Sequence, residues 1–299
     1  MAQPETVWHY TDAAGVIGIL GGNSVVRPRD VVGTLDCRPE FRATAVEYLN
    51  DSRELIHGLT ILRDELIAPA IAAAEADSAQ DGPRSTSTPK EKAEFLRKFC
   101  EVIDRVEIRE YPRHIHCYVT SFSENPDLLS QWRGYCGGLN GFAIGIDVAC
   151  MPEEAEAKLK QVKYSGTLRD SSDIMNLASL WLRRFVLDRS QAPRPSEQLL
   201  DQYLRELAVF AAQFKHEGFG EEAEWRIIRR GSDGANYRSR ATQLVPYVTW
   251  DLPPESVVGV YVGPGPSQNE NHLAVKSLLH SYGYHSAAEN VILSPTPFK

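Results

Sequence analysis

Two carboxylates and one guanidinium alternate along the segment EEAEWRII. Glu222, Glu224 and Arg226 are each two residues apart, and alternate side chains of a β-strand point to the same face. If the segment is a strand, these three groups share one face, and Trp225 lies between them on the other. Such a face can stabilise positive charge or move a proton. It can equally be a surface ladder in which Arg226 pairs with the carboxylates and adds little stability.

A second polar set stands near the start of the chain, in WHYTD. His9, Tyr10 and Thr11 follow Trp8 at the end of an expected strand, and Asp12 is a typical cap for the helix that AAGVIGILGG predicts. Three hydrogen-bonding side chains at a strand end can hold a polar ligand such as a sugar. The alternative is that His9 and Thr11 only help to cap the following helix.

A third set lies in IHCYVTSFS, which is rich in β-branched and aromatic residues and predicts a strand. Ser121 and Ser123 share one face of that strand, and Phe122 faces the other way. Short hydroxyls at a strand end can bind a ribose. They can also brace the turn around Asn125, which is the more common use.

The next segment, ENPDLLSQWRGYCGG, predicts a helix with Asn125 as its cap and Pro126 in the first helical position. Trp132 and Tyr135 fall on its apolar face. Aromatic residues in such positions more often pack in a core than stack on a ligand, although their polar tips need partners.

A metal-dependent hydrolase is a rival interpretation. His114 and His116 fall on one expected strand face and could bind a metal together with Asp51 or Glu54. No third ligand is spaced nearby, so the pattern favours no metal. The segment YLNDSRE also has a simple structural interpretation, in which Asn50 and Asp51 separate two helices and Glu54 occupies a capping-box position.

Five arginines form a local basic cluster in the last third of the chain. The cluster would suit a pyrophosphate, or it can be a solvated face. Its members are Arg226, Arg229, Arg230, Arg238 and Arg240.

Composition limits the possible classes of protein. Of 299 residues, 42% are hydrophobic and 24% charged, which is typical of a globular core. The net charge of -8 argues against coating nucleic acid or an anionic membrane by bulk charge. Five widely spaced cysteines without a CxxC motif indicate reduced thiols. With no signal-peptide pattern at the start, we expect a cytoplasmic protein that does not enter a membrane.

The order of elements predicts one α+β domain over residues 1–299. Core strands are expected to be interrupted by two helical insertions, at about 38–110 and about 168–215. The first insertion contains a polar segment, about 77–90, that we expect to be a flexible loop. The chain should end in a strand, a helix and a strand.

Taken in order, the motifs HYT, YLNDSRE, SFSE, QWRGYCGGLNGFAIGID and FKHEGFGEEAEWRII resemble the bacterial family called domain of unknown function 2971. The resemblance extends from about residue 7 to about residue 265. The motif order is also similar to that of the ADP-ribosyltransferase fold, which implies a split β-sheet core. In that comparison His9, the SFS segment at 121–123 and the EAE segment at 222–224 match the positions that bind NAD and catalyse transfer.

The resemblance implies that NAD is a substrate of an ADP-ribosyltransferase or NAD glycohydrolase. It makes Glu224, Glu222 and His9 the catalytic candidates. A toxin or phage-defence role is a fold-level analogy. The acceptor of the ADP-ribose would be a protein or a nucleic acid. A further alternative is a sensor that binds a nucleotide without catalysis. The implied NAD-binding residues are His9, Tyr10, Thr11, Ser121, Ser123, Tyr135 and Arg226.

Overall fold

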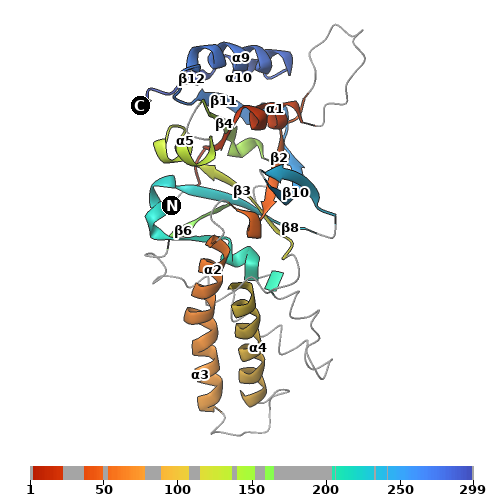
Figure 1. The fold of residues 1–299 in the computed structure, drawn as a ribbon, viewed down its shortest axis with the longest axis vertical. Helices are drawn as coiled ribbons and strands as arrows, with labels where there is room; N and C mark the ends of the chain where they lie inside the picture. Colours follow the sequence, from red (N-terminus) through yellow and green to blue (C-terminus); the bar gives the residue numbers. More distant parts are fainter. Residues whose placement is uncertain are drawn as a thin grey trace.

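The computed structural model of the protein describes residues 3–22, 37–49, 53–77, 89–107, 115–136, 140–151, 159–164, 204–205, 207–231, 234–240 and 242–297. Strands occupy the centre, helices lie at both ends, and the arrangement is α+β, as the sequence predicts (Figure 1). The predicted flexible loop and most of the second predicted insertion lie outside the described residues.

Ten strands of the described chain form one sheet. Its members are β1 (Thr6–Thr11), β2 (Glu40–Ala45), β3 (Cys117–Ser123), β4 (Phe142–Asp147), β5 (Leu159–Gln161), β8 (Glu224–Arg230), β9 (Asn236–Arg240), β10 (Gln243–Asp251), β11 (Val257–Val262) and β12 (Val291–Leu293). The main path runs in the order β12-β11-β4-β1-β3-β2-β10-β9, and β8 pairs with β3 and β5. Two short parallel strands, β6 (Lys163–Tyr164) and β7 (Phe214–Lys215), form a separate ladder.

The sheet splits along β3. One side of β3 pairs with β8 over its full length, from Cys117 to Ser123. The other side pairs with β2 at Tyr118 and Val119 and with β1 at Ser123 alone. The two neighbouring strands therefore diverge, and Ser121 lies on the open edge between them.

Strand β1 is anchored by its antiparallel pairing with β4 from Thr6 to Thr11. Trp8 lies opposite Gly145, where an added Cβ would stand 2.6 Å from the Trp8 ring. The ring of Trp8 also meets Tyr261 edge to face, with centroids 5.1 Å apart. Only glycine leaves room for the indole here, so Gly145 helps to fix the position of β1.

Helix α1 (Ala13–Gly21) follows β1 directly. The carboxylate of Asp12 accepts a hydrogen bond from the Gly15 N–H at 2.7 Å, and Gly22 ends the helix with a positive φ of 48°. This confirms the predicted cap and the predicted glycine stop. At the other end of the chain β11, α9 (Gln268–Ser281), α10 (His285–Ala288) and β12 form the predicted strand–helix–strand ending, with β11 and β12 parallel.

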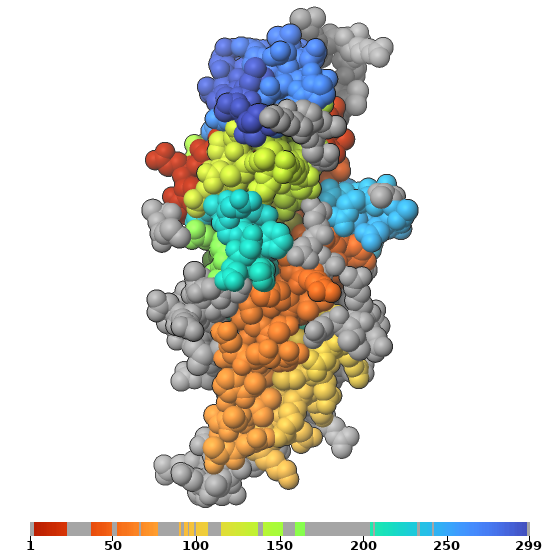
Figure 2. All heavy atoms as spheres, turned by 60° about the vertical axis from the view of Figure 1, so that its left-hand side comes forward, coloured from red at the N-terminus to blue at the C-terminus, as the bar shows by residue number. Residues whose placement is uncertain are grey.

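A helical arm extends from the sheet. Helix α2 (Glu54–Leu62) continues through a π-helical turn (Arg63–Ile67) into α3 (Ala68–Asp77), and α4 (Pro89–Glu107) packs beside α3. Figure 2 shows this arm in orange and yellow below the rest of the molecule. Arg63 donates to Asp104 across the pair at 2.8 Å.

Two local predictions are wrong. Residues 38–76 were expected to be helical, but Glu40–Ala45 form β2, because this segment pairs with both β10 and β3. The regular apolar stripe begins only at Leu55, within α2. Helix α5 (Leu129–Tyr135) starts later than Asn125 and has Leu128 at its N-cap.

Candidate active site

The divergence of β1 and β2 opens a cavity of about 460 Å³. Its walls include His9 of β1, Ser121 of β3, Glu222 just before β8, and Glu224 and Arg226 of β8. Segments that are more than a hundred residues apart in sequence thus meet at one site. Helix α1 and strands β2 and β9 also line the cavity, through Gly15, Gly18, Arg42, Thr44, Arg238 and Arg240.

His9 spans the split in the sheet. Its Nδ1 lies 2.9 Å from the Ser121 carbonyl oxygen, and its ring meets Phe41 and Phe122 edge to face. A carbonyl only accepts, so Nδ1 carries the proton and donates. Burial lowers the pKa of His9, and nearby Arg238 lowers it further. The imidazole is therefore neutral near pH 7 and presents Nε2 as an acceptor.

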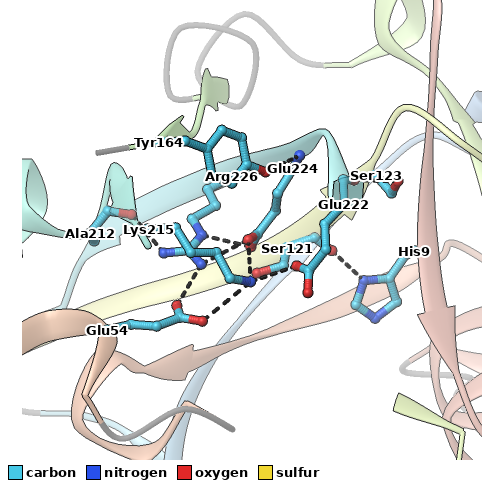
Figure 3. A network of polar contacts seen from close by, with 10 residues as sticks. All are labelled: His9, Glu54, Ser121, Ser123, Tyr164, Ala212, Lys215, Glu222, Glu224 and Arg226. Atoms are coloured by element: carbon cyan, nitrogen blue, oxygen red, sulfur yellow. Dashed lines mark hydrogen bonds and ion pairs between the residues drawn. The ribbon is translucent and has the colours of Figure 1, made fainter. Parts of the chain in front are cut away.

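Five charged side chains form a buried cluster beside His9 (Figure 3). Lys215 donates to Glu222 at 2.6 Å and to Glu224 at 2.9 Å, and lies 3.3 Å from Glu54. Arg226 donates to Glu224 through Nε at 2.7 Å and to Glu54 at 2.6 Å. Arg226 is only 1% exposed and Lys215 only 2%. The surface ladder considered from the sequence is therefore wrong, because the pairs lie in the interior.

Glu224 is held as an anion at neutral pH. It accepts from Arg226 through both oxygens and from Lys215, and Ser121 adds a side-chain hydrogen bond. Burial alone would raise the pKa of Glu224, but Arg226 and Lys215 reverse this effect and lower the pKa to about 2. These four donor groups, two from Arg226 and one each from Lys215 and Ser121, fill the hydrogen-bond acceptor positions of the Glu224 carboxylate.

Glu222 behaves differently. It lies in the 3-10 helix η5 (Glu217–Glu222), and Ala223 follows with a left-handed φ of 41°, so the strand starts one residue after Glu222. Burial raises the pKa of Glu222, with Lys215 acting in the opposite direction. Two carboxyls whose environments move their pKa values apart are a common arrangement for acid–base chemistry.

Tyr10 and Ser123 both hydrogen-bond to the backbone beside the site, but only Tyr10 lines the cavity. The Tyr10 hydroxyl donates to the Asn125 carbonyl at 2.8 Å and accepts from the Leu128 N–H at 2.9 Å. Its ring packs on Trp132, with centroids 4.6 Å apart. Tyr10 is 5% exposed, and its hydroxyl and ring both contact protein groups, although the residue lines the cavity.

Ser123 is a bracing residue. Its hydroxyl donates to the Glu222 carbonyl at 2.7 Å and accepts from the Asn125 N–H at 3.1 Å. It does not line the cavity within the described residues. Its effect on the site is to fix the backbone of Glu222, which agrees with the turn-bracing alternative.

Thr11 and Tyr135 both line the cavity. The Thr11 carbonyl accepts from the Cys136 thiol at 3.3 Å, which ties β1 to the end of α5. Tyr135 is partly buried, and burial together with the carboxylates of Glu224 and Glu222 raises the pKa of its phenol. Tyr135 is thus the aromatic ring of the predicted set that remains available to a ligand.

Sequence reasoning missed Lys215 entirely and undervalued Glu54. Lys215 stands in the motif FKHEGFGEEAEW, seven residues before Glu222, but its short strand β7 gave no signal of burial. Glu54 is the first residue of α2 and is 8% exposed. Its carboxylate faces Arg226 and Lys215, and the residue lines the cavity.

The metal-dependent interpretation gains no support from the described residues. Among them, no group of three or more His, Cys, Asp or Glu side chains is placed to hold a metal ion. His114 and Asp51 lie outside that part of the chain. His116 precedes β3 with a positive φ of 54° and is not among the cavity residues.

Residues 131–227 match the family described as Protein of unknown function (DUF2971). This match confirms, over that segment, the family that the motifs indicate. It includes Tyr135, Lys215 and the Glu222–Arg226 stretch, whereas His9 lies outside it. Searches of curated proteins and of solved structures gave no match. Within the described residues, none of the helices has the length and apolar character needed to span a membrane.

Proposed function

We propose that this protein uses NAD as a substrate, as an ADP-ribosyltransferase or an NAD glycohydrolase. The observation that supports the proposal is the meeting of His9, Ser121 and Glu222 around one cavity, although they come from distant segments. A volume of about 460 Å³ falls in the range of small-molecule sites. The motif order of the ADP-ribosyltransferase fold supplies the choice of ligand.

In this proposal, the bond between nicotinamide and ribose C1′ breaks, and its electron pair leaves with the nicotinamide nitrogen. The ribose then carries oxocarbenium character, as in glycoside hydrolysis. The charges facing the ribose come from a cluster with three carboxylates, Glu54, Glu222 and Glu224, and two cations, Lys215 and Arg226. With all groups ionised the cluster keeps one net negative charge, which stabilises a developing cation.

We assign the direct role to Glu222 and a supporting role to Glu224. Glu224 already accepts from four donors, so a ribose hydroxyl would have to displace one of them. Glu222 is more exposed, with 11% of its side-chain surface accessible against 4% for Glu224. Glu222 then takes the proton from the attacking hydroxyl of water or of an acceptor. A protein and a nucleic acid are both chemically suitable acceptors.

His9 and Tyr135 hold the substrate in this scheme. The free Nε2 of neutral His9 accepts a hydrogen bond from a ribose hydroxyl, while Nδ1 stays bound to Ser121. The ring of Tyr135 covers the nicotinamide. Both side chains line the cavity on the side of the charged cluster.

Release of nicotinamide from NAD tests the proposal. Glu222→Gln should reduce the rate by about 10²- to 10³-fold, the usual loss when one charge-stabilising group is removed. Glu221→Gln is the matched control, because Glu221 is exposed, adjacent in sequence and not a cavity residue. It should retain the wild-type rate.

Mass spectrometry of the protein after incubation with NAD separates transfer to the chain itself from hydrolysis. The proposal fails if the folded wild-type protein neither binds nor cleaves NAD. It also fails if NAD is bound and left intact, which is the behaviour of a nucleotide sensor.

A further inference from the structure

Three arginines share one face of the sheet and line the same cavity as Glu54, Glu222, Glu224 and Arg226 of the charged cluster. Arg238 and Arg240 belong to β9, and Arg42 to β2, with β10 between them. Directly opposed residues of paired strands point to the same face of a sheet. The three arginines and Thr44 lie opposite every second residue of β10, so all four side chains are on one face. The opposed pairs are Gln243 with Arg240, Val245 with Arg238, Tyr247 with Thr44, and Thr249 with Arg42.

All three arginines line the cavity. Burial lowers the pKa of Arg238, and the like charges of Arg42 and Arg240 lower it further. Placing three cations together costs free energy unless an anion joins them. Groups kept at such a cost are often functional.

Arg238 has unused hydrogen-bonding capacity. One terminal nitrogen donates to the Thr44 hydroxyl at 2.9 Å. Its Nε is buried and, within the described chain, has no hydrogen-bond partner. The nearby carboxylate of Asp12 also lines the cavity, but it is engaged as the cap of α1 through Gly15. Arg42 lies over the ring of Tyr247, with its guanidinium carbon 5.2 Å from the ring centroid.

We propose that Arg42, Arg238 and Arg240 form a diphosphate-binding subsite for a nucleoside diphosphate group. Arginine forks match phosphate oxygens in pairs, and an Arg nitrogen without a partner is the donor that such an oxygen would meet. The N-terminal end of α1 at Gly15 lies on the same cavity wall and adds a favourable dipole. This proposal rests on the proposed function, since it places the two phosphates of NAD at the end away from the scissile bond.

The occupant is a small nucleotide. The arginines open into a cavity of about 460 Å³ that also holds the carboxylate cluster, and a polynucleotide would bring further phosphates against those carboxylates. The whole chain carries a net charge of -8, which opposes binding along an extended nucleic acid.

ADP binding, measured by titration calorimetry at low ionic strength, tests the subsite without any need for catalysis. Wild-type protein should bind ADP, AMP should bind more weakly, and inorganic pyrophosphate should compete. Arg42→Gln and Arg238→Gln should each weaken ADP binding about tenfold or more, the loss of one charged hydrogen bond. Arg230→Gln is the matched control, because Arg230 is exposed on β8 and does not line the cavity.

Thermal unfolding of each variant shows whether it folds. If Arg238→Gln does not fold, Arg42→Gln alone decides the test, because Arg42 is exposed. Unchanged ADP affinity in folded Arg42→Gln and Arg238→Gln would overturn the subsite. Tighter binding of a single-stranded oligonucleotide than of ADP, lost in the same variants, would also overturn it.

The two proposals fail separately. Arginine-dependent ADP binding by a protein that never cleaves NAD supports the subsite and removes the proposed function. Cleavage of NAD with an unchanged KM in both arginine variants supports the proposed function and removes the subsite.

Discussion

Glu222 and Glu224 share one ammonium group, yet their pKa values move in opposite directions. Lys215 donates to both, at 2.6 and 2.9 Å. Burial raises the pKa of Glu222, whereas Arg226 and Lys215 overcome the burial of Glu224 and lower its pKa to about 2. One carboxyl is thus held as an anion, whereas the other takes up a proton more readily than an ordinary glutamate.

The pH dependence of NAD cleavage should report Glu222. Its folded-state pKa lies above the ordinary value of 4.5, so Glu222 is protonated, and inactive as a base, below a pH that is itself higher than 4.5. The rate should therefore fall as the pH drops through that raised pKa. Rates measured between neutral and acid pH should show this limb in the wild type and in Glu221→Gln. A limb that persists unchanged in Glu222→Gln would assign it to another group.

Glu224→Gln should destabilise the protein by about 3–5 kcal/mol, because it leaves Arg226 and Lys215 buried with one carboxylate fewer. Urea unfolding at neutral pH measures the difference in free energy of unfolding. Glu224 has a lowered pKa, so the stability it contributes is fully present above its ordinary pKa of 4.5 and is lost as the pH falls towards 2. The gap between wild type and variant should shrink over that window, and a gap that stays constant would argue against the ion pairs as its source.

Arg226→Lys tests the geometry of the cluster at constant charge. Arg226 donates to Glu224 through two nitrogens, to Glu54 at 2.6 Å and to the Ala212 carbonyl at 2.8 Å. A lysine offers one donor centre and cannot reach all three partners. We expect a loss of about 2–4 kcal/mol in the free energy of unfolding. A change below about 0.5 kcal/mol, the usual range for surface positions, would mean that charge alone holds the cluster.

Gly145→Ala should destabilise the protein by about 1–3 kcal/mol through overpacking. Gly145 is on β4, which pairs with β1, and the new methyl group would lie 2.6 Å from the ring of Trp8 and 3.0 Å from Val258 of β11. Gly134→Ala is the control, because nothing lies within 4 Å of its added Cβ and the position is helical. The control should be neutral or slightly stabilising. Equal melting temperatures for both variants would show that the Trp8 contact does not fix β1.

Local sequence signals predicted the parts of the fold that depend on near neighbours. Asp12 identified the start of α1, and its side chain accepts from the N–H of Gly15, three residues later. Gly22 identified the end of the helix. The alternation within β8 placed Glu224 and Arg226 on one face, as found. The motif order linked His9 with the late glutamates, which line the same cavity.

Other features depend on contacts between distant segments, which no short pattern contains. Strand β2 forms because β3 and β10 pair with it. Glu222 leaves the strand because Ala223 adopts a left-handed conformation, and Lys215 becomes buried because three carboxylates from different elements surround it. Nothing near Tyr10 in the sequence shows that its ring packs on Trp132.

A crystal structure of the Glu222→Gln variant soaked with NAD would show how the cavity holds this substrate, because the substitution should slow cleavage while leaving the cavity intact. We predict that the nicotinamide ribose lies between His9 and position 222, with the diphosphate towards Arg238. NAD bound outside this cavity, or a cavity that stays empty while NAD binds in solution, would contradict the account.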